Sequence, residues 1–411
     1  MTSKLNMNMK RATPGDDGVP EAGETLKGIR VLDFTAMMAG PYCARWLSDL
    51  GAEVIKVEPP DGDHMRTRAP VRDGFSAYYG HLNAGKKSVV IDLKRPEGVA
   101  LARDLAGKCD VVLEAFRPGV MERLGLGADK LRALNPGLIY CSISGFGQNT
   151  SKSGHPAYAP VIHAGSGYYM ANFDYQDGLD RPANSGIPMA DMLCAIFTAF
   201  SIQSALLRRN RSGAGCTIDV NLMDSMMNVL TFELQSSQFP LKNRRPLYKP
   251  LKANDGFILV APVNEKNFRS VCVATGHPEW LDDPVLNTDA ARYENWSEYM
   301  ARIEQWAGER SASECEQALM EAGVPCSRYK RISEAMQESH FSERGSFTEI
   351  HDGAGTYKTV NLPFAFDGQK PTAHPEVRGL GQDTMEVLSS VLGLPQERIE
   401  ALMRERVVGA Q

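Results

Sequence analysis

Short β-branched runs alternate with helical stretches through the first half of this chain, and this alternation limits its fold more than any other feature. The first run, residues 29–34, is followed by the break Ala39-Gly40-Pro41, a helical stretch to about Leu50 and a second run at residues 52–57. Pro41 suits the first turn of a helix, because a missing amide proton costs nothing there. When a helix connects two neighbouring strands, those strands run parallel to each other, so this segment predicts a βαβ unit.

The same alternation recurs further along the chain. Strands are predicted at residues 88–92, 110–114, 138–143 and 217–221. Helices are predicted at residues 96–107, near Met121 and Lys130, at 188–208 and at 223–234. Strands separated by amphipathic helices favour an α/β fold with a parallel, doubly wound sheet. The sequence has no repeat of roughly 20–50 residues, which argues against a solenoid.

The length of 411 residues predicts about two domains. Residues 1–25 are polar and rich in Gly, Pro, Asp and Glu, and they predict a flexible tail. Residues 26–240 contain the alternation described above. The composition changes near residue 242, and residues 241–347 are helix-rich with three tryptophans, which predicts a smaller α/β domain. The remaining segment, 348–411, is predicted to hold amphipathic helices at 383–392 and 395–406.

Composition and charge exclude several classes of protein. The net charge of −5 argues against a uniformly basic nucleic-acid-binding protein, although a local basic patch for phosphates is compatible with it. The eight cysteines are scattered without a CxxC pair, and the eight histidines form no HExxH pair, so no metal site is predicted. The most apolar stretch, 187–207, is interrupted by Asp191 and followed by Arg208 and Arg209, which favours a buried helix over a membrane span. We therefore expect a soluble, cytoplasmic protein without a membrane or nucleic-acid partner.

Familiar nucleotide and hydrolase motifs are absent from the sequence. The turn after the first strand does not read GxGxxG, and no Walker A or GxSxG sequence occurs. Asp191 is a candidate for chemistry, because it lies in the first turn of the apolar helix predicted to begin near Pro188. A carboxylate near free amides and the positive end of a helix dipole stays ionised and can attack an activated acyl group. From position alone, a purely structural role of Asp191 at the helix end is the favoured interpretation.

Basic residues gather at predicted strand ends and helix starts of the first sheet. Open α/β sheets bind phosphorylated ligands at the carboxyl ends of their strands. As a set these residues suggest a phosphate-bearing ligand, although for each residue alone a solvated surface charge is the favoured interpretation. They are Lys86, Lys87, Lys94, Arg95, Arg117 and Arg123.

From about Leu26 to Arg406 the chain resembles the class III CoA-transferases, which include formyl-CoA transferase and carnitine CoA-transferase. The order and spacing of several short segments carry this resemblance. They are Val31-Leu-Asp-Phe-Thr35, Ala39-Gly-Pro41, Leu50-Gly-Ala-Glu-Val-Ile-Lys-Val-Glu58, Asn83-Ala-Gly-Lys-Lys-Ser-Val-Val-Ile-Asp-Leu93, Val112-Leu-Glu-Ala-Phe-Arg-Pro-Gly119, Ser142-Ile-Ser-Gly-Phe-Gly147, Ala190-Asp191 and Gly213-Ala-Gly-Cys-Thr-Ile-Asp-Val220.

The resemblance implies an interlocked homodimer. In each subunit a large Rossmann-like, CoA-binding domain would be built from both chain ends, so that residues 348–411 return to residues 26–240. It places the catalytic aspartate of the family at Asp191. It also implies coenzyme A, as an acyl-CoA thioester, and a carboxylic acid as the substrates, with no metal. The implied reaction passes through an aspartyl anhydride and an aspartyl-CoA thioester.

Further site residues follow from the same resemblance. Met37, Ile91, Lys94 and Arg123 fall at CoA-binding positions, and Tyr158 falls where the family often has an active-site aromatic residue. Gly40 lies in a turn whose amides suit developing oxyanions. Met38 stands where formyl-CoA transferase carries a glutamine, so we expect an acid that is larger or more apolar than oxalate.

Two other functions stay open at this point. The related α-methylacyl-CoA racemases use an aspartate at the Asp191 position together with a histidine that falls near Tyr158. A tyrosine, with a pKa of about 10, is a poor base at neutral pH, and only His155 and His163 are near in sequence. A non-catalytic acyl-CoA-binding protein is the third possibility, although binding alone does not require Asp191.

Overall fold

The structure is a computed structural model that describes residues 21–239 and 247–409. Residues 1–20 of the predicted tail lie outside the described residues. The end of that predicted tail is structured, since Ala22–Glu24 form a short 3-10 helix in which Ala22 is buried. The chain forms two compact units, one from residues up to 235 together with residues from 342 onward, and one from residues 236–341.

The first unit is built on a seven-stranded sheet in the order β14-β5-β2-β1-β6-β7-β8. Neighbouring strands pair in parallel except β14, which lies antiparallel to β5 at one edge. The predicted α/β class with a mostly parallel central sheet is thereby confirmed. The strands are β1 (Arg30–Asp33), β2 (Glu53–Glu58), β5 (Lys87–Ile91), β6 (Val111–Glu114), β7 (Ile139–Ser144), β8 (Thr217–Asn221) and β14 (Val408–Gly409).

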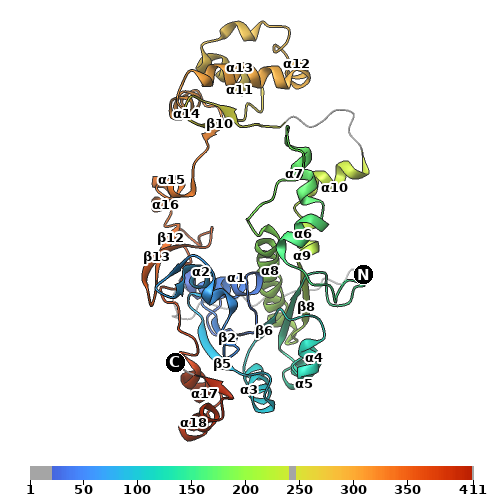
Figure 1. Ribbon diagram of the computed structural model, residues 1–411, viewed down its shortest axis with the longest axis vertical. Coiled ribbons are helices and arrows are strands. Elements are labelled where there is room, and N and C mark those ends of the chain that lie inside the picture. Colours follow the sequence, from blue (N-terminus) through green and yellow to red (C-terminus); the bar gives the residue numbers. More distant parts are fainter. Residues whose placement is uncertain (1–20, 240–246, 410–411) are drawn as a thin grey trace, which may run out of the picture. The chain divides into compact units, whose positions relative to one another are not determined.

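Helices cover both faces of this sheet, because successive side chains of each strand point to opposite sides. Val31 and Val54 pack in the core beneath α1 (Ala39–Asp49) and α8 (Met189–Ser212). Leu32 and Ile55 pack in the opposite core, beneath α3 (Pro96–Ala106), α17 (Thr384–Ser390) and α18 (Gln396–Arg404). Figure 1 shows α17 and α18, in red, beside β5 and α3. The last helices and strand of the chain thus complete the sheet that the first strands begin.

Shorter elements complete the first unit. Its other helices are α2 (Ala77–Asn83), α4 (Val120–Leu124), α5 (Ala128–Leu134), α6 (Ala159–Gly165), α7 (Tyr168–Asp174), α9 (Leu222–Met227), α10 (Thr231–Gln238), which runs past residue 235, α16 (Ser339–Glu343), which begins before residue 342, and the 3-10 turn η2 (His64–Thr67). Two hairpins are formed by β3 (Val71–Arg72) with β4 (Phe75–Ser76), and by β12 (Phe347–Asp352) with β13 (Gly355–Val360).

The second unit has its own core around a three-stranded antiparallel sheet in the order β11-β10-β9. Its buried side chains include Phe268, Trp280, Tyr299 and Trp306. Its elements are β9 (Leu251–Lys252), β10 (Phe257–Val260), α11 (Glu265–Thr275), η3 (Pro278–Leu281), α12 (Asp289–Glu294), α13 (Trp296–Gly308), α14 (Ala312–Glu321), β11 (Cys326–Arg328) and α15 (Ile332–Ala335).

The long helix α8 is less buried than its sequence predicts. One side packs on the sheet and on α1 through small residues such as Ala195 and Ala199. The other side leaves Ile196, Phe200 and Leu207 exposed, with Phe200 69% exposed. By length and composition α8 is the one helix among the described residues that is apolar enough to cross a membrane. A helix that is apolar on all sides is expected to be buried on all sides, but the described residues cover only one side of α8.

The strand order creates a crevice at one point of the sheet. From β1 the chain runs outward to β2 and β5 on one side, and then returns to β6, β7 and β8 on the other. In doubly wound sheets of this kind, ligands bind outside the carboxyl ends of the two strands where the order reverses. Here those strands are β1 and β6, and the residues that follow them are 34–38 and 115–119.

Candidate active site

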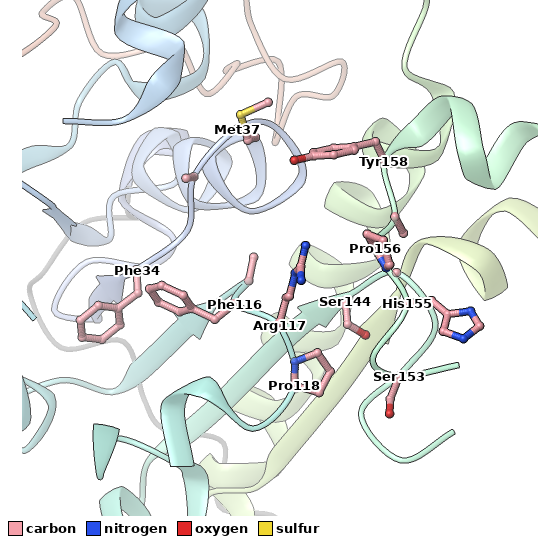
Figure 2. Close-up of a pocket in the computed structure, with 14 residues that line it drawn as sticks. Phe34, Met37, Phe116, Arg117, Pro118, Ser144, Ser153, His155, Pro156 and Tyr158 are labelled. Carbon is pink, nitrogen blue, oxygen red and sulfur yellow. The ribbon is translucent and has the colours of Figure 1, made fainter. Parts of the chain in front are cut away.

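A cavity of about 260 Å³ opens at this crevice. It is lined by the segments that follow β1, β6 and β7, and Figure 2 shows ten of these residues labelled. The hydroxyl end of Tyr158 points toward Met37, and the side chain of Arg117 extends between Phe116 and Pro156. The lining residues are Phe34, Ala36, Met37, Ala115, Phe116, Arg117, Pro118, Ser144, Gly145, Ser153, His155, Pro156, Ala157 and Tyr158.

A second cavity of about 450 Å³ adjoins the first. The two share Phe34, Ala36 and Phe116 in their walls. The second cavity extends along the carboxyl ends of β2 and β5, where Ile91 and Lys94 lie in its wall. Together the two cavities form one elongated site across the ends of five strands, β1, β2, β5, β6 and β7, which suits a long ligand with apolar and charged parts.

Two buried lysines hold the segment that follows β1. Lys86 is 2% exposed, and its ammonium donates to Asp33 Oδ2 at 2.9 Å, to the carbonyl of Pro41 at 2.8 Å and to Asn83 Oδ1 at 2.8 Å. Lys56 donates to the carbonyl of Thr35 at 2.7 Å and pairs with Asp63 at 3.0 Å. The three protons of Lys86 therefore all have acceptors, and residues 35–41 are fixed near both ends.

The pKa values of this pair follow from burial and charge. Burial lowers the pKa of Lys86 to about 8 against the opposing charge of Asp33. For Asp33, burial acts to raise the pKa, but the charges of Lys86 and Lys56 outweigh it and hold the pKa below its usual range. Both groups are thus charged at neutral pH, and the pair is a buried ion pair beneath the site.

Gly40 lies in the first turn of α1, directly after this segment. A Cβ atom at Gly40 would lie 2.3 Å from the side chain of Thr35, so only glycine allows the turn and the helix to approach so closely. Met37 adopts a positive φ of 67°, a strained conformation for a residue with a side chain. The helix leaves the amides of Ala39 and Gly40 without an intrahelical acceptor, and Pro41 has no amide proton to offer.

Asp191 lies in the first turn of α8, as predicted. Its side chain is half-buried, and burial raises its pKa to about 6. The sequence-based argument from the helix dipole predicts a carboxyl that ionises readily, whereas desolvation dominates in the structure. The group is ionised at neutral pH but is more basic than an exposed aspartate, which makes it a better nucleophile.

Tyr78 on α2 is a neighbour of Asp191 that sequence reasoning missed. Burial and then the charge of Asp191 raise the pKa of Tyr78. The Tyr78 hydroxyl donates to Met38 Sδ at 2.8 Å, so Met38 and Tyr78 lie together. In the sequence, Tyr78 is one of two adjacent tyrosines in a short helical stretch, and nothing distinguishes it from its buried neighbour Tyr79.

The predicted site residues divide into three groups. Met37 and Tyr158 line the first cavity, and Ile91 and Lys94 line the second. Arg123 lines neither cavity, but it precedes Leu124, which lines the second cavity. Its Nη1 lies 3.1 Å from the point where a Cβ atom added to Gly119 would lie. Asp191, Met38 and Gly40 are not in the wall of either cavity.

The predicted basic set needs correction. Lys86 is saturated by protein acceptors as described above, and no proton of its ammonium is left for a phosphate. Lys87 pairs with Glu53 and Glu386, at 2.8 and 2.9 Å. Arg95 donates to the carbonyl of Glu405 at 3.1 Å. Lys87 begins β5 and Arg95 follows this strand, and both have partners on the C-terminal segment that packs beside it, whereas Lys86 is bonded to the end of β1, to α1 and to the end of α2. Lys94 and Arg117 instead line the cavities.

The two histidines near Tyr158 differ in environment. His163 is fully buried, and its Nε2 accepts the amide proton of Ala190 at 3.0 Å. His155 is exposed and lines the first cavity, with its ring edge-on to Phe146 at 6.2 Å. Of the two, only His155 faces space that a substrate can enter.

Among the described residues, no group of three or more His, Cys, Asp or Glu side chains is arranged to hold a metal ion.

Comparison with known proteins places the chain in a family. A family model described as CoA-transferase family III matches residues 26–384. The succinyl-CoA–D-citramalate CoA-transferase of Chloroflexus aurantiacus is 33% identical over 396 residues, which cover 93% of this chain and 98% of that protein. The formyl-CoA:oxalate CoA-transferase of a Bradyrhizobium species is 30% identical, with 92% of this chain and 95% of that protein covered.

A solved structure agrees with this result. The crystal structure of a CAIB/BAIF family protein from Brucella suis has a TM-score of 0.79 and 29% sequence identity, and covers 89% of this chain and 99% of that one. The succinyl-CoA:glutarate CoA-transferase of Mus musculus is a further relative, 30% identical over 93% of this chain and 90% of its own length. The chain is therefore a CoA-transferase and belongs to CoA-transferase family III.

Proposed function

We propose that this enzyme transfers CoA from an acyl-CoA to a carboxylic acid with Asp191 as the nucleophile. The observation that carries the proposal is the half-buried carboxyl group of Asp191, fixed in the first turn of α8 with its pKa raised to about 6. Its pKa leaves it ionised at neutral pH, and partial removal from water strengthens it as a nucleophile.

The proposed reaction has four steps. A carboxylate oxygen of Asp191 attacks the thioester carbonyl carbon and the C–S bond breaks. CoA leaves as its thiolate, and a mixed anhydride between Asp191 and the donor acid remains. The thiolate attacks the aspartyl carbonyl of that anhydride, which releases the donor acid and leaves an aspartyl-CoA thioester. The acceptor carboxylate then attacks the carbonyl carbon of this thioester, the C–S bond breaks, and CoA leaves as its thiolate while a second mixed anhydride remains. The thiolate finally attacks the acceptor acyl carbon, which gives the new acyl-CoA and frees Asp191.

The two adjoining cavities suit the CoA part of the substrate. We assign the phosphate contacts to Lys94 and Arg117, which line the cavities, and to Arg123 beside them. Ile91 and Met37 supply apolar contact. The first-turn amides of Ala39 and Gly40 are donors for the oxyanions that form at each attacked carbonyl.

The acceptor is proposed to be larger than oxalate. Relatives of this chain are named for succinyl-CoA, D-citramalate and glutarate as well as for oxalate. Met38 contacts Tyr78, whose pKa the charge of Asp191 helps to raise, so these two side chains lie where an acid would approach the nucleophile. A thioether cannot donate a hydrogen bond to a carboxylate, which favours an acid with a longer or more apolar chain.

The test is mass spectrometry of reactions that combine acetyl-, formyl- and succinyl-CoA with oxalate, succinate, glutarate and citramalate. Transfer to the longer acids, with hydroxylamine trapping at Asp191 during turnover, is the expected result. A strong preference for oxalate contradicts the acceptor proposal. Exchange of an α-proton of a 2-methylacyl-CoA with deuterated solvent, without a second acid, indicates the racemase instead. Binding of CoA without either reaction indicates a non-catalytic protein.

We also propose that a second copy of the chain covers the exposed side of α8 in an interlocked homodimer, and that the enzyme is soluble and cytoplasmic. Ile196, Phe200 and Leu207 share one side of the helix, and an apolar patch of this kind is expected to be buried against protein. Phe200→Glu is expected to lower the dimer fraction in sedimentation experiments. Leu134→Glu, on exposed α5, is the matched control with unchanged sedimentation, and equal behaviour of the two variants contradicts the proposal.

A further inference from the structure

The first turn of α8 lacks a cap from its own segment. The N-cap residue is Pro188, which has no side-chain acceptor, and the first hydrogen bond of the helix runs from the amide of Met192 to the carbonyl of Pro188. The amide of Met189 is satisfied by the carbonyl of Ile187. Ala190, the next residue, is fully buried, so its amide needs an acceptor from another part of the chain.

His163 of α6 supplies that acceptor. Its Nε2 lies 3.0 Å from the amide nitrogen of Ala190, and its side chain is fully buried. A ring nitrogen that accepts a hydrogen bond carries no proton, so in the neutral ring the proton lies on Nδ1. Nδ1 lies 3.1 Å from the hydroxyl of Tyr169, which in turn donates to Asn184 Oδ1 at 3.1 Å. The chain of donors and acceptors is complete for this one tautomer.

The surroundings of His163 keep the ring neutral. Burial lowers its pKa. The titratable and charged groups on the helices packed against α6 are Tyr168, Tyr169 and Asp174 on α7, Asp191, Cys194, Arg208, Arg209 and Arg211 on α8, and the exposed Asp224 on α9. Tyr168 and Tyr169 contact the ring with centroids at 5.3 Å. No ion pair involving His163 is formed within the described part of the chain.

We infer that His163 is a positioning residue for the transfer reaction: its neutral imidazole caps α8 at Ala190 and thereby holds the adjoining nucleophile, Asp191, in its attacking position. This inference rests on the proposed role of Asp191. Protonation of Nε2 converts the acceptor into a donor that faces the amide of Ala190, which breaks the cap. His163 touches no reacting atom in this scheme and acts only through the first turn of the helix.

Three variants test the inference. In His163→Leu the amide of Ala190 loses its acceptor, and kcat for the best donor–acceptor pair of the panel is expected to fall by about 10- to 100-fold, as for a nucleophile misplaced by about 1 Å. The Kd of CoA should be unchanged. In His163→Gln, Oε1 accepts the same amide proton and Nε2 donates to Tyr169, so kcat should recover to within about threefold. His340→Gln, at an exposed site on α16, is the matched control.

The pH profile separates positioning from a loss of stability. In the wild type, protonation of either Asp191 or His163 removes the active form. The acid limb of a plot of log kcat/KM against pH therefore steepens toward a slope of two. In His163→Gln only Asp191 titrates, and the slope is expected to stay at one. This readout remains available if His163→Leu does not fold. If the acid limb of His163→Gln has the same slope as that of the wild type, the inference is overturned.

Hydrogen–deuterium exchange provides a test that does not depend on activity. The amide of Ala190 is expected to exchange faster in His163→Leu than in the wild type and in His163→Gln, and equal exchange in all three contradicts the cap. If exchange changes as expected but Asp191→Asn remains active, the proposed nucleophile is wrong and the cap stands. If Asp191 is essential but His163→Leu matches the wild type in kcat, the positioning role alone is wrong.

Discussion

Asp191→Asn is expected to reduce kcat/KM for CoA transfer by at least about 10³-fold, the largest effect of any single substitution at this site. The asparagine is nearly the same size but cannot form the anhydride, so the covalent route is lost and only binding and polarisation remain. The Kd of CoA is expected to stay within about threefold of the wild type, because Asp191 is not in the wall of either cavity. Calorimetry with CoA and steady-state kinetics measure the two effects separately.

Asp224→Asn is the matched control for this substitution. Asp224 also lies in the first turn of a helix, α9, but it is exposed and its carboxylate accepts from the side chain of Asn221. Its replacement should leave kcat/KM within about threefold of the wild type. Wild-type turnover in Asp191→Asn would falsify the assignment of the nucleophile.

The pH dependence of the wild type provides an independent measure of the same carboxyl group. Its pKa is raised to about 6 by burial, so the ionised, reactive form predominates above that pH and is lost as the pH falls through it. We therefore expect kcat/KM to decline below pH 6, whereas an exposed aspartate with a pKa near 4 would sustain activity about two pH units lower. A plateau that extends down to pH 4 contradicts the burial of Asp191.

The sheet was predictable from the sequence because its signal is local. Residues 110–114 and 138–143 each contain a run of consecutive apolar residues, which marks a strand covered on both faces. Their positions match β6 and β7 closely. The placement of Asp191 in the first turn of α8 followed from the change to an apolar helical pattern after Pro188. Neither inference required knowledge of what the chain packs against.

The environment of the site was not predictable in the same way. Lys86 and Lys87 are adjacent and identical in type, yet Lys86 is 2% exposed and bonded to three acceptors, while Lys87 pairs with the partly exposed Glu53 and Glu386. Lys86 lies just before β5, and its burial comes from contacts with Asp33 and Pro41, which stand far earlier in the chain. Tyr78 and His163 are brought near the start of α8 by the folding of segments that are separate in sequence. Which side of α8 is exposed depends on what packs against the helix, and the apolar pattern of the helix alone does not show this.

Lys86→Met is expected to be the most destabilising of these substitutions, lowering the free energy of unfolding by about 3–5 kcal/mol. Methionine fills most of the space of the lysine side chain, but it leaves the carboxylate of Asp33, which is fully buried, without its ion pair. It also removes the donor to the carbonyl of Pro41, so the segment 35–41 loses one of its two anchors. Urea denaturation followed by fluorescence measures the change.

Two further variants make this prediction specific. Lys87→Met removes a lysine whose partners, Glu53 and Glu386, are partly exposed to water, and it should cost less than about 1 kcal/mol. The double substitution Asp33→Asn with Lys86→Met removes both charges, and it should be more stable than Lys86→Met alone because no buried charge remains unpaired. Equal stability of Lys86→Met and Lys87→Met would show that the ammonium of Lys86 does not hold the segment on which Met37, Met38 and Gly40 lie.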